Sequence, residues 1–133
     1  MRSIVHGFTF LFLLTVLIRA ELPPSAYEAM QAAAPEFLAI EILRVDYEPG
    51  ETMEQQNITV LARVTKVHRS ASSLQEGAII SVVYPLAERV PGFVGPGRVP
   101  VPSEGESTVA YLKPGDKPDQ FTPAAGAMTF HHF

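Results

Sequence analysis

The segment Phe37–Pro49 (FLAIEILRVDYEP) constrains the fold of this 133-residue chain more than any other stretch. Apolar and other side chains alternate along it, but the alternation changes phase halfway, and the apolar positions are Leu38, Ile40, Ile42, Leu43, Val45 and Tyr47. A strand changes face in this way only at a bulge or sharp bend, or where it passes between sheet layers. One long strand that bends and serves two layers is typical of a small closed barrel. We therefore expect a strand that is kinked between Ile42 and Leu43.

Three further stretches carry strand patterns. Asn57–Ser70 restarts the alternation and changes phase between Val64 and Val67, which predicts a second bend. Ala78–Pro85 (AIISVVYP) is rich in β-branched residues and is the most strand-prone segment. Thr108–Lys113 predicts a fourth strand, because a Pro-Gly turn follows it.

The closing stretch, FTPAAGAMTFHHF, predicts a fifth strand that begins at Thr122 or Ala127 and ends at Phe130. Within it, Ala124–Ala127 are all small residues, which allow two backbones to approach closely. We expect a strap that crosses one end of the barrel and anchors Met128 and Phe130 in the core. A groove for close contact with a ligand is the alternative.

A short helix is expected ahead of the first strand, over Ala26–Ala34. Alanine favours helix, and Ser25 with Glu28 has the spacing of a capping box. A helix of this length is marginal alone, so it must dock on the rest of the domain. Tyr27 and Met30 are the side chains expected to dock it.

Together these elements predict a mainly β fold, a five-stranded OB-like Greek-key barrel with one short N-terminal helix. The stretches ARVTKVHRSASSLQEGAIISVVYP and GPGRVPVPSEGESTVAYL resemble the netrin-like modules. The shared plan is a strand ending in a basic residue, a Leu-x-x-Gly turn, an apolar strand, then a glycine and a Tyr/Phe-Leu strand. Residues Phe37–Phe130 also resemble small exported bacterial proteins of unknown function that end in Pro-Ala-Ala-Gly followed by an aromatic residue.

The resemblance implies architecture alone, since folds of this kind host many functions. The best-known netrin-like proteins are the tissue inhibitors of metalloproteinases, which grip a catalytic zinc through an N-terminal cysteine and carry disulfides. This chain has no cysteine, so neither feature is carried over to it.

The first 20 residues predict export. Phe8–Ile18 is an almost uninterrupted apolar run of 11 residues, and a membrane-crossing helix needs about 20. Ala20 suits signal-peptide cleavage, although Arg19 so close to the cut leaves an uncleaved anchor as the alternative. We expect residues 1–20 to be a signal peptide and residues 21–133 a single secreted or periplasmic domain with no stable membrane insertion after cleavage.

The expected mature domain is acidic. It keeps eight basic side chains, ten less Arg2 and Arg19, against 14 acidic ones, a net charge of −6. Affinity for nucleic acid comes largely from Lys and Arg that neutralise phosphates. We therefore expect a protein or another extended ligand as partner and no nucleic acid, while the oligomeric state stays open.

No motif in the chain predicts an enzyme. Cysteine and the Gly-x-Ser-x-Gly elbow of serine hydrolases are both missing from the sequence. GFVGPGR has the glycines of a phosphate loop, but Pro96 lacks the N–H that such a loop presents to phosphate. We expect no catalytic or cofactor-binding residues and no cofactor.

The histidines predict no metal site. His68 is flanked by basic residues that oppose cation binding, and adjacent residues such as His131 and His132 point to opposite faces of an extended chain. The alternative is a small metal-dependent or hydrolytic envelope enzyme that uses His68 and acidic residues together with the C-terminal histidines His131 and His132. Glu41, at the phase change of the first strand, is the acidic residue most apt to face a cleft.

The Pro/Gly-rich loop Pro91–Pro102 is the best candidate for a partner surface. Its large apolar side chains predict an ordered loop, with Phe93 and Val94 at an apolar tip and Arg98 supplying a charge. We take Phe93, Val94, Arg98 and His68 as the possible partner surface; capping an open barrel end is the alternative role of the loop. The sequence thus favours an exported, non-enzymatic binding or interaction domain.

Overall fold

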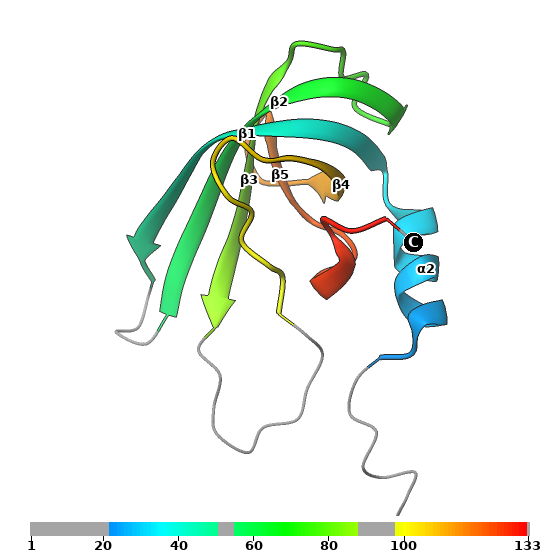
Figure 1. Ribbon diagram of the computed structural model, residues 1–133, viewed down its shortest axis with the longest axis horizontal. Coiled ribbons are helices and arrows are strands. Elements are labelled where there is room, and N and C mark those ends of the chain that lie inside the picture. Colours follow the sequence, from blue (N-terminus) through cyan, green and yellow to red (C-terminus); the bar gives the residue numbers. More distant parts are fainter. Residues whose placement is uncertain (1–21, 51–54, 88–97, 133) are drawn as a thin grey trace, which may run out of the picture.

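The alternating segments of the chain form a closed β-barrel, and one helix packs beside it (Figure 1). The computed structural model describes residues 22–50, 55–87 and 98–132. The elements in this part of the chain are α2 (Pro24–Ala33), β1 (Glu36–Pro49), β2 (Gln55–Ser70), β3 (Ile79–Ala87), β4 (Ser107–Pro114), β5 (Gln120–Pro123) and the 3-10 helix η1 (Gly126–Met128).

The strands follow the order β1-β2-β3-β5-β4 around the barrel, and β4 pairs with β1 to close it. The pairing of β3 with β5 is parallel, whereas the other neighbours are antiparallel. This mixed five-stranded barrel is compatible with an OB-like fold. The fold class predicted from the sequence is confirmed.

The kink in β1 is a β-bulge at Leu43. Ile42 pairs with Ala62 and Arg44 pairs with Leu61, so Leu43 is an extra residue in β1. Before the bulge β1 pairs with both β2 and β4, and at Ile42 the N–H donates to the Glu106 carbonyl (2.8 Å) while the carbonyl accepts from the Gly105 N–H (2.8 Å). Beyond the bulge β1 continues along β2, and its Val45 N–H donates to Glu104 Oε1 (3.1 Å) in the segment before β4. The predicted kink is therefore confirmed.

The predicted second bend, in β2, is also confirmed. Its partners in β1 skip Thr65 and His68, which are extra residues on the β2 side. Both side chains are exposed, whereas Val64 is buried. Extra residues of this kind bend a strand and increase its twist, which lets β2 wrap around the closed end of the barrel.

The barrel interior is filled by aliphatic side chains together with Tyr84 and Phe121. Part of the Pro/Gly-rich loop lies across this core, because Val99 and Val101 pack against it and the Tyr84 hydroxyl donates to the Pro100 carbonyl (2.9 Å). An ordered loop held by its apolar side chains is confirmed for residues 98–102.

Helix α2 differs from expectation at its start. Pro23 is the N-cap and Pro24 begins the helix, with no side-chain capping bond, so the predicted capping box of Ser25 and Glu28 is wrong. The physical reason is that proline already has the backbone angle of a first helical residue and moves the start ahead of Ser25. Docking through Tyr27 is confirmed by its burial.

The C-terminal stretch corrects a second expectation. β5 covers Gln120–Pro123, so a strand that continues to Phe130 is wrong. Gly126 takes a φ of +51° and starts the turn η1. The chain then runs beside β4, where the Tyr111 N–H donates to the Thr129 carbonyl (2.9 Å) and the Tyr111 carbonyl accepts from Ala124 (3.0 Å).

The expected strap is therefore present in the form of a turn rather than a strand. Ala125 is fully buried against Tyr111, and Phe130 packs on the barrel core. Met128 is half-buried and does not enter the core as expected. A small residue at position 125 allows the strap to approach β4 this closely.

The expected signal peptide lies outside the described residues. In the part of the chain that is described, no helix combines the length and the apolar character required to cross a bilayer.

Candidate functional site

A groove of about 400 Å³ lies on the outer face of β2 and β3. The inner positions of these strands, such as Val60 and Val82, are buried in the barrel, so the residues between them face outward. The groove is lined by Glu48, Thr59, Ile79, Ser81, Val83 and the turn Lys117–Gln120. The outward residues of β2 and β3 therefore form the floor of the groove, and the turn between β4 and β5 forms one wall.

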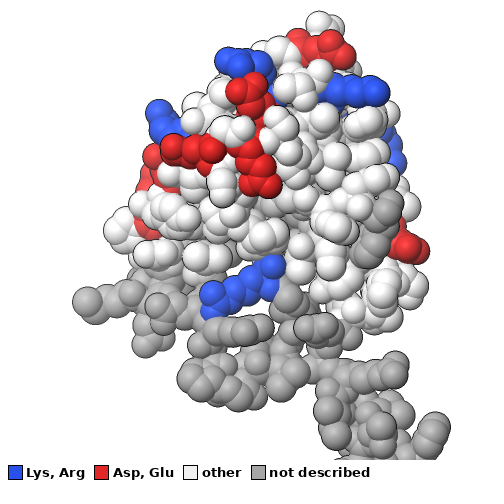
Figure 2. Space-filling view, in the orientation of Figure 1, with Lys and Arg blue, Asp and Glu red and all other residues white. Residues whose placement is uncertain are grey.

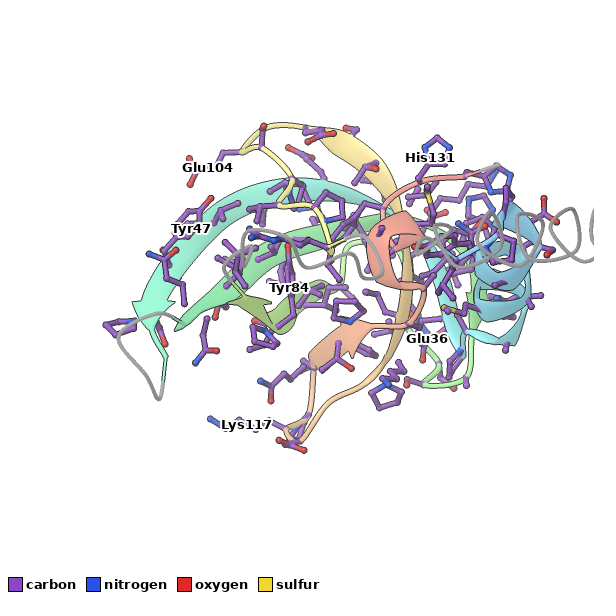
Figure 3. The ribbon with its side chains drawn as sticks, turned by 90° about the horizontal axis from the view of Figure 1, so that it is seen from below. Glu36, Tyr47, Tyr84, Glu104, Lys117 and His131 are labelled. Carbon is purple, nitrogen blue, oxygen red and sulfur yellow. The ribbon has the colours of Figure 1, made fainter. Side chains whose placement is uncertain are left out.

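The wall is held in place by hydrogen bonds. The Ser81 N–H donates to the Asp119 carbonyl (2.9 Å), which joins the turn to β3. Within the turn, the Lys117 N–H donates to Gln120 Oε1 (3.1 Å), and the Gly115 N–H donates to the Gln120 carbonyl (2.7 Å). Figure 3 shows Lys117 at the tip of this turn, projecting away from the barrel.

Two backbone features explain the local sequence of the turn. Asp119 has a φ of +59°, a left-handed conformation that aspartate tolerates better than most residues. A Cβ at Gly115 would lie 3.1 Å from the Gln120 carbonyl oxygen, so glycine allows the turn to close tightly. Asp119 and Gly115 therefore allow the tight backbone conformation of this turn, which forms one wall of the groove.

The groove combines several kinds of contact. Thr59 and Ser81 offer hydroxyls, and Glu48 and Asp119 offer carboxylates. Ile79 leaves 45% of its surface exposed, and it is one of two large hydrophobic side chains in the described residues with such exposure. An apolar side chain among hydrogen-bonding groups is typical of a binding surface.

Two of the four residues of the predicted partner surface, Arg98 and His68, lie in the described part of the chain. Phe93 and Val94 lie outside the described residues. Arg98 is exposed at the start of the segment whose Val99 and Val101 pack on the barrel core, whereas His68 is exposed near the end of β2 and stacks on Phe37. The structure does not bring Arg98 and His68 together.

His68 instead belongs to a column of rings that crosses three strands. Phe37 stacks between His68 and Tyr111, with 4.4 Å between ring centroids on each side. His132 lies 5.5 Å from Phe37, and its Nδ1 is hydrogen-bonded to the Tyr111 hydroxyl (2.5 Å). Burial raises the pKa of the Tyr111 hydroxyl. The column ties the C-terminal end to the barrel wall.

Of the residues in the alternative enzyme hypothesis, His68 and His132 both lie against Phe37, whereas Glu41 makes a different contact. Glu41 Oε2 lies 3.4 Å from Arg63 Nη1, an exposed ion pair, whereas His68 is occupied by the stack on Phe37. Over residues 22–50, 55–87 and 98–132, no three His, Cys, Asp or Glu side chains gather as a metal ion would require.

Among the described residues, three buried polar side chains, Gln31, Glu36 and Thr129, escaped the sequence analysis. Glu36 is fully buried in the barrel (Figure 3), where Oε1 accepts from the Ser72 N–H (2.9 Å) and Oε2 has no partner among the described residues. Leu38 and Ile42 point into the barrel, and the same alternation continued to the residue two before Leu38 indicates that Glu36 points inward as well. Gln31 is 6% exposed and bonds the C-terminal strap.

The fold and the groove define the class of this protein, a small closed β-barrel that presents a polar groove on the outside of β2 and β3. No family model, curated protein or solved structure matches the chain. Its function must therefore be argued from the groove.

Proposed function

We propose that this protein is a non-enzymatic binding domain that holds an extended ligand in the β2–β3 groove. The observation that carries the proposal is the position of the groove. OB-type barrels bind their ligands on the face of strands 2 and 3, flanked by the loop between strands 4 and 5. The groove occupies this face and has the turn Lys117–Gln120 as its wall.

The proposal includes export and a netrin-like relationship. The apolar run Phe8–Ile18 has the length of a signal-peptide core, which supports secretion to the periplasm or the exterior. The strand and turn plan that resembles netrin-like modules supports the architecture that carries the groove, whereas the binding role is argued from the groove itself. No cofactor is required for such a role.

The test is a ligand screen followed by amide NMR. Extended probes of three classes, a blocked peptide, a neutral oligosaccharide and a short oligothymidylate, are added to the ¹⁵N-labelled domain in the millimolar range. We expect at least one class to shift the amides of Thr59, Ser81 and Val83. Shifts confined to the ring column around Phe37, or no shifts with any probe, would contradict the proposal.

A blocking variant makes the test specific. Ser81→Arg places a long side chain on the groove floor and is expected to weaken binding at least about ten-fold, or 1.4 kcal/mol. Thr65→Arg makes a similar change at an exposed position of β2 outside the groove and should leave binding unaltered. Equal effects of the two variants would place the ligand elsewhere.

A further inference from the structure

We infer that the ligand of the groove is an extended polypeptide segment that carries a basic side chain. The inference rests on the proposed function and adds the chemical class of the ligand. Its support comes from the spacing of the groove floor, from the balance of charge around it and from the kinds of side chain in the lining.

The spacing of the floor suits a peptide. Ile79, Ser81 and Val83 are successive outward residues of β3, so they recur about every 6.4–6.8 Å. The side chains on one face of any extended peptide recur with the same spacing. A peptide lying along β3 therefore meets an apolar, a hydroxyl and an apolar side chain in step with its own.

The charge around the groove favours a basic ligand. Glu48 and Asp119 supply two carboxylates, against the single ammonium of Lys117. Among the described residues, the two ion pairs are Arg44 with Asp46 (2.8 Å) and Arg63 with Glu41 (3.4 Å), and neither uses a carboxylate of the groove. Figure 2 shows acidic and basic side chains intermixed over β1 and the approach to β4, so neighbouring charges there largely offset each other.

The lining argues against the other two ligand classes. Single-stranded nucleic acid is held by a positive groove and by aromatic rings on which bases stack. The lining residues of this groove include no aromatic ring and only one basic side chain. Sugar rings also pack on aromatic faces, so an oligosaccharide finds no platform here. A basic peptide matches the lining better, because its backbone can bond to the hydroxyls, its apolar side chains can pack on Ile79 and Val83, and its basic side chain can pair with a carboxylate.

Fluorescence anisotropy of labelled blocked peptides tests the inference. The probe is acetyl-Thr-Val-Lys-Val-Lys-Val-Thr-amide, and its partners replace both lysines by norleucine or by glutamate. At an ionic strength of about 0.15 M, we expect affinity to fall in the order lysine, norleucine, glutamate. Glu48→Gln and Asp119→Asn should each weaken the lysine peptide about two- to five-fold, as expected for exposed ion pairs.

The control variant is Glu28→Gln, which removes the same charge from the exposed side of α2 and should leave the affinity unchanged. The inference is overturned if all three variants weaken binding equally, because that indicates general attraction to an acidic protein. It is overturned as well if the norleucine peptide binds as tightly as the lysine peptide. An oligosaccharide that binds the groove while the lysine peptide does not would overturn the inference and leave the proposed function standing.

Discussion

Replacing Gln31 by methionine is expected to lower the free energy of unfolding by about 2 kcal/mol. Gln31 Nε2 donates to the carbonyls of Met128 (2.9 Å) and His131 (2.5 Å), which joins α2 to the C-terminal strap. Methionine has a similar length and helix propensity but donates no hydrogen bond. A lost bond costs about 1 kcal/mol, and a carbonyl left without a partner in a buried place costs up to about 3 kcal/mol. Because His131 is exposed and water can reach it, we expect the lower part of this range.

Thermal and urea unfolding followed by far-UV circular dichroism measure the loss. For a domain of this size, 2 kcal/mol corresponds to a fall in Tm of roughly 8 °C. Gln75→Met is the matched control, since Gln75 is an exposed side chain in the turn between β2 and β3. Its effect should stay within about 0.5 kcal/mol.

The reasoning also predicts where the variant loosens. Without the bonds from Gln31, the last residues should be released by carboxypeptidase faster than in the parent protein, while the barrel amides keep their protection from hydrogen exchange. If Gln31→Met is as stable as Gln75→Met, the two bonds contribute nothing measurable. The role assigned to Gln31 would then be refuted.

Two further predictions concern the loop over the core and the strap. Tyr84→Phe removes the bond to Pro100 and should cost about 1 kcal/mol at neutral pH in urea unfolding. Burial raises the pKa of Tyr84, so the native state keeps its proton when the unfolded state ionises near pH 10; the parent protein should therefore lose stability as the pH rises above about 10, and Tyr84→Phe should show a smaller loss. Truncation after Thr122 removes the strap with the buried Ala125, and a fragment that still unfolds cooperatively in calorimetry would show the strap to be dispensable.

Local periodicity was enough to predict the first four strands, whereas the fifth strand ends at Pro123 and not at Phe130. The phase changes near Leu43 and Val64 are visible in the sequence because a bulge inserts one residue into a period of two, and each change corresponds to a bulge in the structure. The start of α2 was misjudged at Ser25 because two signals competed, and a proline at the first position outweighed a serine cap. The bulges and the start of α2 depend on residues that are neighbours in the sequence, so sequence patterns can indicate them.

The groove was not visible in the same way. Thr59 and Ser81 look like ordinary outward positions of two strands, and nothing nearby in the sequence marks them as a floor. The turn forms a wall of the groove because β5 pairs in parallel with β3. This pairing places Asp119 beside Ser81, although the two residues are far apart in the sequence. The β3–β5 pairing depends on closure of the whole barrel, so no short sequence motif predicts it.

The bulge at Leu43 connects the architecture to the proposed binding role. Up to Ile42, the even-numbered residues of β1 point into the barrel, and an uninterrupted strand would place Asp46 and Glu48 inside as well. The extra residue reverses the phase, so Val45 packs against the core and Glu48 reaches the outer face beside the groove. One inserted residue thus spares the core two carboxylates, whose burial without partners is costly. The same residue places one of them where a basic ligand would meet it. In this protein the bulge that reverses the phase of β1 also places the Glu48 carboxylate in the lining of the proposed binding groove.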